Sequence, residues 1–566
     1  MTRVSDNQFA ELHDQYHALD SHQALKYLLP SVAYRRVALC AVIFGILLSG
    51  ITQSLCAQQP SVATRRLPSA EKIVESYLKA IGGKKRVANI RDATYQWMIQ
   101  LNDQTMGLAR TLTKTPASLR SEMTFGNGQV ISAATPRSAW TYGLDRQLHT
   151  LTDGEAAAAR LQAALDAGRL VNIRKSNVLA RVVSLKDLKT GPAYAVEFSL
   201  RSGARFRYLF SSNTQLLVAI EDEARKTITH FEDYRFEGNI LEAHRVSVNN
   251  GSTGELTFLL QRASYNAGIS DAVFDPPTPV EKLDVVALLH EVSFNQAELE
   301  KRTAEYSFLQ KETDREINTK GEVTKETIKM FEVFPVAHRA PIMKMISENG
   351  VPLTGERATK EQKRVEEEFS KAERDKEKDE QRMEKNRAER ERKKAAKAKD
   401  GEDDDLDISG FLRVCEFVSP RHERFRDRDA VVFDFRPRPG FKSRNRQENL
   451  ISKLVGVVWI DPADKQVMRL EARLAEEFKM AGGLLVNLRP GAAVVMEQTR
   501  MVEGVWLPRL AQINLSVKVL LFASGDFNKT IEWSDYKHFS GDVGDYKLDA
   551  PRTEPSKFDA PTPKKP

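Results

Sequence analysis

The side chains that most often perform catalysis occur in this sequence, but not in spacings that define a reaction. It contains no G-x-x-x-x-G-K-[ST] phosphate loop, no H-E-x-x-H zinc pair and no G-x-S-x-G nucleophile elbow. His290 and Glu291 lack the second histidine of a zinc pair, and their setting, LLHEVSF, is better explained by an amphipathic helix. His230, His244 and His338 are scattered over strand-like or turn-like segments. We therefore expect no catalytic residues, no metal site and no cofactor.

One stretch combines positive charge with aromatic rings. It begins at Arg421 and reads RHERFRDRDAVVFDFRPRPGFKSRNR, with phenylalanines alternating with arginines. In an exported protein this composition favours lipid headgroups or acidic envelope polymers over DNA. The alternative interpretation is a strand, VVFDF, whose outward side is basic. The candidate headgroup contacts are Arg424, Arg426, Arg436 and Arg438.

Length and composition limit the class of protein. The chain has 566 residues, enough for two to four domains, and its 41% hydrophobic and 29% charged residues are typical of a folded protein. The 85 basic residues stand against 78 acidic ones, which is mixed charge rather than a polycation. We therefore expect no nucleic-acid partner.

An uncharged segment, VALCAVIFGILLSGITQSLCA at 37–57, follows Arg35 and Arg36. About 20 apolar residues can span a bilayer, and the preceding arginines would keep residues 1–36 cytoplasmic. The remainder would then be exported, either released by cleavage after Ala57 or held by an uncleaved anchor. The 36 residues before the segment argue against cleavage or indicate a misassigned start codon. Cys56 invites a lipoprotein interpretation, which Leu55 disfavours because a small residue is usual there.

After a linker at 58–69, the patterns predict a β-rich unit at 70–278. Ser69 precedes an amphipathic helical segment that ends at Gly82-Gly83. A capping-box spacing, Thr152 to Glu155, predicts a second helix over 155–168. From 194 to 264 short alternating segments are separated by polar turns, which indicates an antiparallel sheet.

A second unit is predicted at 280–552, interrupted by a charged helical insertion at 355–407. Residues 355–400 contain 17 Lys or Arg and 14 Asp or Glu, and pairs such as Glu361/Arg364 fall three apart. We expect a lone, solvated, partly disordered helix, with an envelope protein as a potential partner. The only cysteine after residue 57 is Cys415, so a disulfide framework is excluded there. The tail at 553–566 should be disordered.

The two units share an internal repeat. RFRYLFSSNTQLLVAIEDE and FEDYRFEGNILEAHRVSVN in the first correspond to LVGVVWIDPADKQVMRLEARL and MEQTRMVEGVWLPRLAQINLSV in the second. These segments, with the opening helix and NAGISDAVFDPP, resemble the LolA-like superfamily of outer-membrane lipoprotein-sorting and lipid-carrier proteins. Pro508 stands where that family usually has a proline, whereas the first unit has Ala243.

The resemblance implies an α+β fold, mainly antiparallel β, with two curved incomplete barrels. Each barrel would have helices over an apolar cavity. The N-terminal apolar helix and the charged insertion would complete the chain. Apolar residues that alternate along the predicted strands are the candidate cavity residues. The side chains of an ordinary sheet core would give the same alternation. The candidates are Trp97, Ile99, Trp140, Phe206, Leu209, Val218 and Ile220 in the first unit and Phe308, Val458, Ile460, Met468, Leu470 and Trp506 in the second.

The sequence thus favours a non-catalytic carrier or sensor that binds lipid or the acyl chains of a lipoprotein. It would be periplasmic, or anchored in the inner membrane and facing the periplasm. The alternatives are a membrane-anchored structural or protein-interaction scaffold without cargo, and a hydrolase whose chemistry is not recognised. A large apolar cavity would favour the carrier or sensor, and converging titratable groups in a cleft would favour the hydrolase.

Overall fold

The computed structural model describes residues 67–538, except for 172, 174–176, 250–254, 278–283, 304, 319–321, 337–340, 373, 375–410, 412, 481–485, 502–503 and 520–522. The predicted N-terminal segments at 1–36 and 37–57, most of the linker, most of the charged insertion, His338 and the tail lie outside the described residues. Among the helices within them, none has both the length and the apolar character needed to cross a bilayer.

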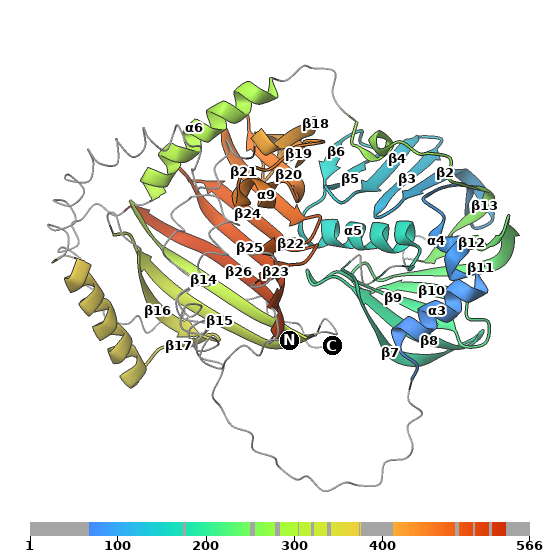
Figure 1. Ribbon diagram of the computed structural model, residues 1–566, viewed down its shortest axis with the longest axis horizontal. Helices are drawn as coiled ribbons and strands as arrows, with labels where there is room; N and C mark the ends of the chain where they lie inside the picture. The colour runs from blue at the N-terminus through green and yellow to red at the C-terminus, as the bar shows by residue number, and fades with distance from the viewer. Residues whose placement is uncertain are drawn as a thin grey trace, which may run out of the picture.

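The first unit is a single antiparallel sheet of thirteen strands (Figure 1). Its order is β6-β5-β4-β3-β2-β1-β13-β12-β11-β10-β9-β8-β7, so the first and last strands are neighbours in the middle. The strands are β1 Asp92–Leu101, β2 Gln104–Lys114, β3 Ser118–Phe125, β4 Gly128–Ala134, β5 Ala139–Tyr142, β6 Leu148–Thr150, β7 Leu179–Leu188, β8 Gly191–Ser199, β9 Arg205–Ser211, β10 Leu217–Asp222, β11 Thr227–Glu237, β12 Ile240–Asn249 and β13 Glu255–Tyr265. The helices are α3 Ala70–Ala80, α4 Lys84–Ala88, α5 Asp153–Gly168 and the 3-10 helix η3 Asp271–Phe274.

The second unit repeats this topology. Its main path is β17-β16-β15-β14-β26-β25-β24-β21-β20-β19-β18, and β23 joins it beside β25 and also pairs with β22. The strands are β14 Tyr306–Ile317, β15 Val323–Phe334, β16 Ile342–Glu348, β17 Val351–Pro352, β18 Cys415–Phe425, β19 Arg428–Pro437, β20 Leu454–Asp461, β21 Gln466–Leu474, β22 Phe478–Met480, β23 Val486–Leu488, β24 Ala493–Arg500, β25 Trp506–Val519 and β26 Ala523–His538. The helices are α6 Val285–Thr303, α9 Arg446–Ile451 and a helix over 355–372.

The tandem repeat predicted from the sequence is therefore confirmed over eleven strands, β1–β4 and β7–β13, which correspond to β14–β17, β18–β21 and β24–β26. In each unit a helix comes first, strands run out to one edge, the chain crosses over, and strands return from the other edge. The repeated sequence segments form β9–β10 and β20–β21, and then β11–β12 and β24–β25. The described strands form two open sheets rather than closed barrels.

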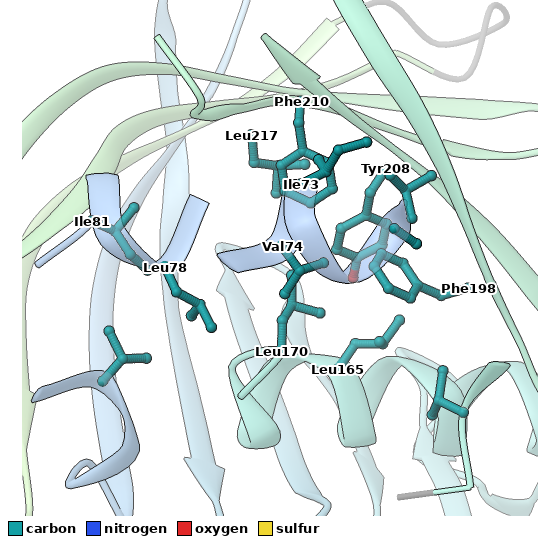
Figure 2. Close-up of a cluster of buried hydrophobic side chains, with 14 of the residues drawn as sticks. Ile73, Val74, Leu78, Ile81, Leu165, Leu170, Phe198, Tyr208, Phe210 and Leu217 are labelled. Atoms are coloured by element: carbon teal, nitrogen blue, oxygen red, sulfur yellow. The ribbon is translucent and has the colours of Figure 1, made fainter. Parts of the chain in front are cut away.

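Helix α3 covers strands β8 to β10. Ser69 Oγ accepts a hydrogen bond from Lys72 N at 3.3 Å, which caps the helix, and Gly83 N donates to Leu78 O at 2.8 Å where it ends. Gly82 has φ +134°, and a Cβ there would lie 2.6 Å from Asn239 O. The buried side of α3 packs on Phe198, Tyr208 and Phe210 (Figure 2), and it consists of Ile73, Val74, Leu78 and, just past the helix end, Ile81. Each such side chain contributes about 1.5–3 kcal/mol on burial.

Helix α6 covers the equivalent strands of the second unit. Its Leu288, Leu289 and Val292 pack on Phe433, Val458 and neighbouring side chains of β19 to β21. The covering helix and its three strands are thus the best-preserved part of the repeat.

Helix α5 differs in detail from its prediction. It begins at Asp153 rather than at 155, and the Thr152 side chain makes no capping hydrogen bond. The Asp153 carboxylate instead pairs with Arg469 of the second unit, at 2.7 Å. Six of its sixteen residues, four of them alanines, are buried. The small side chains allow α5 to lie between the two units (Figure 1), with one side on β2 to β5.

The described part of the charged insertion, 355–372, corrects the prediction of a lone solvated helix. The expected Glu361–Arg364 ion pair is present at 2.7 Å. However, Val365 is fully buried, and the Phe369 ring lies 5.6 Å from that of Phe334. Glu361 also accepts from Met345 N at 2.8 Å, and Arg364 donates to a β16 carbonyl. This helix therefore satisfies backbone groups along β16, near the edge of the sheet, where unpaired strands invite aggregation.

Candidate functional site

The inner face of the first sheet, defined here as the face that α3 and α5 contact, carries a continuous apolar surface. Strand pairing aligns Ile99 with Phe258 and then Val246 on one side, and with Gly107 and then Phe125 on the other. Cross-strand partners share a face, so these side chains form one row.

A second row runs parallel to the first. Trp97 pairs with Leu260 on one side and with Ala109 and then Met123 on the other. Trp97 stacks on Tyr95, which packs against the α3–α5 core and so identifies the face. We call Trp97, Ile99, Met123, Phe125, Val246 and Phe258 the apolar wall. Ile99 is fully buried, whereas the other five are only half-buried.

A polar cluster lies where α5 ends beside the wall. Tyr265 Oη and Tyr95 Oη donate to Glu242 Oε1 at 2.7 and 3.1 Å, and Arg169 Nη1 donates to the same oxygen at 3.1 Å. The Arg169 guanidinium also lies over the rings of Tyr95 and Tyr265, at 5.9 and 5.3 Å. Arg169 has φ +46°, so the C-terminal end of α5 is held to the sheet through a left-handed residue.

In this cluster Arg169 stays charged and the two tyrosines stay neutral near neutral pH. Burial opposes the charge on Arg169, but Tyr95 and Glu242 together raise its pKa above the ordinary value. Burial raises the pKa of Tyr95 and of Tyr265, so both stay neutral donors. The cluster therefore serves to hold α5 rather than to transfer protons.

One further carboxyl of α5, that of Asp166, is partly buried near Tyr77 of α3 and Tyr208 of β9. Burial raises the pKa of Asp166 to about 6, although Gln162 Nε2 donates to its Oδ2 at 2.8 Å. Tyr77 of α3 also has a raised pKa because of burial, followed by the charge of Glu242. Asp166 is thus the titratable group of this layer that changes charge closest to neutral pH.

The predicted cavity residues of the first unit fall in several places. Trp97 and Ile99 belong to the wall, and Phe206 and Ile220 to the layer under α3. Leu209 and Val218 pack in a separate cluster with alanines of β8 and β10.

Trp140 lies on the face away from α5. It pairs with Ala133, whereas the neighbouring Ala134 and Ala139 pack against α5. Its Nε1 donates to Phe274 O at 3.1 Å, and Arg120 lies over its ring. Alternation along a strand fixes this orientation, and which alternate positions face inward was not readable from periodicity alone.

The predicted residues of the second unit are also divided. Val458, Ile460 and Leu470 lie under α6. Phe308 packs with Ala511, Ile531 and Trp533. Met468 and Trp506 belong to a cluster with Trp459, and Trp506 Nε1 donates to Asp464 Oδ2 at 2.9 Å.

The central inner face of the second sheet is charged. Pairing runs from Leu470 under α6 through Met496, Ala511 and Ile531 to Glu312 of β14. Lys529 Nζ donates to Glu312 Oε2 at 2.6 Å, and both side chains are 9% exposed. Gln310 donates to Glu312 at 2.7 Å and accepts from Trp533 Nε1 at 2.9 Å.

The four predicted headgroup arginines are not gathered in one patch. Arg424 and Arg426 lie at the turn between β18 and β19, where Arg426 pairs with Glu497 at 3.1 Å. Arg436 pairs with Glu416 at the far end of the same hairpin, beside Arg438. Arg436 lies eight residues beyond Arg428, where β19 begins next to the turn, which is about 27 Å along the strand. A single headgroup could not contact both pairs.

Sequence reasoning missed Met123, Phe125, Val246 and Phe258 of the wall and, beside them, Arg169 and Glu242. The alternation in SEMTF, HRVSV and ELTFLL is a usable signal for strands. What it lacks is the register that brings β3, β12 and β13 beside β1.

No protein-family model and no curated protein matches the sequence. Similar solved structures include a LolA superfamily protein from Nitrosomonas europaea, at 9% identity and TM-score 0.27, covering 37% of this chain and 99% of that one. A putative outer membrane lipoprotein-sorting protein domain from Vibrio parahaemolyticus has 10% identity and TM-score 0.26, covering 36% and 97%. The MucA/MucB complex of Pseudomonas aeruginosa has 7% identity and TM-score 0.17, covering 81% and 94%.

Proposed function

We propose that this is an exported, non-catalytic protein that binds acyl chains of a lipid or lipoprotein on the inner face of its first unit. The observation that carries this proposal is the apolar wall. Two adjacent rows cross β3, β2, β1 and β13 without a charged side chain, and most members are only half-buried. An acyl chain of fourteen carbons gains roughly 10 kcal/mol from burial before the costs of binding.

Extension of an acyl chain beyond the wall would involve movement of α3 rather than of α5. Helix α5 is held at its start by the Asp153–Arg469 ion pair and at its end by Arg169 on Glu242. Helix α3, by contrast, packs through apolar contacts. Because the layer under α3 is filled by its own side chains (Figure 2), an acyl chain that extends into it must displace this helix.

The cellular setting of this proposal depends on the sequence. The uncharged segment at 37–57 would direct the chain to the periplasm or anchor it in the inner membrane. The arginines of the β18–β19 hairpin would contact anionic headgroups at one end of the hairpin only. An envelope protein would bind the acidic and basic side chains of the insertion.

A second candidate function is a structural or interaction scaffold without cargo. It is favoured by the tight packing under α3, where Val196 and Phe198 are fully buried and Phe210 is 1% exposed. In that case the sheet face serves only as a core.

Mass spectrometry of organic extracts distinguishes the two functions. We expect protein isolated from the envelope without detergent to carry about one phospholipid or acylated peptide per chain. Met123→Glu should remove the lipid and the uptake of a fluorescent fatty acid, because it places a charge on the wall. Met98→Glu is the matched control, since Met98 is also half-buried but alternates with Trp97 and Ile99 and faces away.

Two results would refute the carrier function. One is a clean extract from wild-type protein that also takes up no fatty acid. The other is equal loss in both folded variants, since the face of β1 would then be irrelevant. Circular dichroism checks that each variant is folded.

A further inference from the structure

The outer side of α5 meets the second unit through arginines of both units. Arg160 of α5 and Arg473 of β21 approach the same carboxylate oxygen, Glu471 Oε2, at 3.9 and 3.2 Å. Arg469 approaches the other oxygen, at 2.9 Å. Three guanidinium groups thus converge on one carboxylate that is 2% exposed. We call Arg160, Arg473 and Glu471 the junction cluster.

The three arginines are compensated unequally. Arg469 has two further carboxylates, Asp153 and Glu497, each at 2.7 Å. Arg473 donates to the carbonyls of Pro136 and Arg137 as well as to Glu471. Among the residues that the structure describes, Arg160 has only the 3.9 Å contact with Glu471.

Most of the five guanidinium donors of Arg160 therefore have no acceptor among the described protein groups, and its side chain, 18% exposed, keeps partial contact with water. Burial lowers the pKa of Arg160 to about 9. The positive charge of Arg473 lowers this pKa as well, and the negative charge of Glu471 raises it by less. Burial lowers the pKa of Arg473 as well. The junction cluster holds two guanidinium groups and one carboxylate, and the negative charge of Asp434 also acts on Arg473. Its hydrogen-bond donors still outnumber its acceptors, which favours an added anion.

We propose that Arg160 and Arg473 bind an oxyanion of the phosphate type between α5 and β21, so that the ligand bridges the two units. Both guanidinium groups lie within 4 Å of one oxygen, so a ligand with several acceptor oxygens can accept from both. Their side chains are 18% and 13% exposed, which leaves them reachable from solvent. The anion is either a lipid headgroup or free phosphate.

This site is separate from the apolar wall. Arg160 precedes Arg169 by nine residues, about 14 Å along α5. Anion binding therefore does not depend on the proposed acyl function, and each can fail alone.

Thermal unfolding of the isolated protein tests the proposal with inorganic phosphate as the probe and chloride balancing the ionic strength. We expect phosphate to raise the midpoint and calorimetry to give about one site per chain. Arg160→Gln should weaken phosphate binding at least tenfold. Without phosphate this variant should unfold no earlier than wild type, because it removes an uncompensated charge. Arg110→Gln, in an exposed pair with Glu122, is the matched control and should bind like wild type.

The outcomes separate the alternatives. If Arg160 is only a structural ion-pair partner, Arg160→Gln unfolds earlier and keeps the phosphate response, which would overturn the proposal. The proposal is also overturned if phosphate raises the unfolding midpoint of neither folded wild type nor Arg473→Gln. Flotation with phosphatidylglycerol vesicles, using phosphatidylcholine vesicles for comparison, identifies the source. If the protein binds the vesicles, and if both free phosphate and Arg160→Gln abolish this binding, the anion is a lipid headgroup. If the protein binds phosphate but not the vesicles, the anion is free phosphate.

Discussion

The two units share one topology but differ at the centre of the inner face. In the first, the central strands β1 and β13 present Trp97, Ile99 and Phe258. In the second, the equivalent strands β14 and β26 present Glu312 and Lys529. A repeat can thus keep its strand order and its covering helix while the chemistry of its interior changes.

The helices between the two halves of each sheet, α5 in the first unit and the helix at 355–372 in the second, also differ in what they contact. Helix α5 lies over the inner face of the first sheet and ends in Arg169 beside the wall. The helix at 355–372 instead contacts backbone groups of β16. The proposed acyl site therefore belongs to the first unit alone, and a fluorescent fatty acid should saturate at one per chain.

The largest expected effect is on stability and tests the charged pair at the centre of the second sheet. Lys529→Met leaves Glu312 buried without its cation and should lower the free energy of unfolding by about 3–5 kcal/mol. The double variant Lys529→Met/Glu312→Leu removes both buried charges and should recover most of this loss, short of wild type because Asp314, 3.7 Å from Lys529, also loses its cation. Urea denaturation of the three proteins measures both.

A double variant as unstable as the single one would contradict this explanation. The second unit would then need the charge pair for its packing, and its interior could not be compared with the apolar wall.

The next effect compares the crossover helices. Leu161 of α5 is fully buried, and Leu161→Ala should cost about 2–5 kcal/mol because it leaves a cavity. Val365 in the helix at 355–372 is equally buried but loses fewer atoms, so Val365→Ala should cost about 1–2 kcal/mol. Thermal or urea unfolding ranks the two. Equal costs would mean that the charged helix is as integral to its sheet as α5.

These differences define what the sequence could reveal. The repeat was readable because β9–β10 and β20–β21 keep the same order of strand, polar turn and strand. The covering helix was readable because Ile73, Val74 and Leu78 recur at helical spacing.

The wall and the junction cluster were not readable, because both depend on long-range placement. Val246 and Phe125 come together only through the pairing of β12, β13, β1, β2 and β3. Arg160 and Arg473 are more than 300 residues apart, and no local pattern marks either. Trp140, whose type suggested a wall, faces away because of a one-residue difference in strand phase.

The smallest effect concerns Asp166, the partly buried carboxyl of α5 near Tyr77 of α3. Burial raises the pKa of this carboxyl to about 6 from an ordinary value near 4, so the folded state favours the protonated form. This preference is fully present below about pH 4 and is lost as the pH rises through 6, so ionised Asp166 destabilises the protein at neutral pH. Asp166→Asn keeps a polar amide beside Gln162 without the charge. It should raise the free energy of unfolding at pH 7.5 by about 1–3 kcal/mol and by much less at pH 4. Asp145→Asn, at an exposed turn of the same unit, is the control and should change stability little at either pH. A gain for Asp166→Asn that is independent of pH would show that the carboxylate is not the source of the cost.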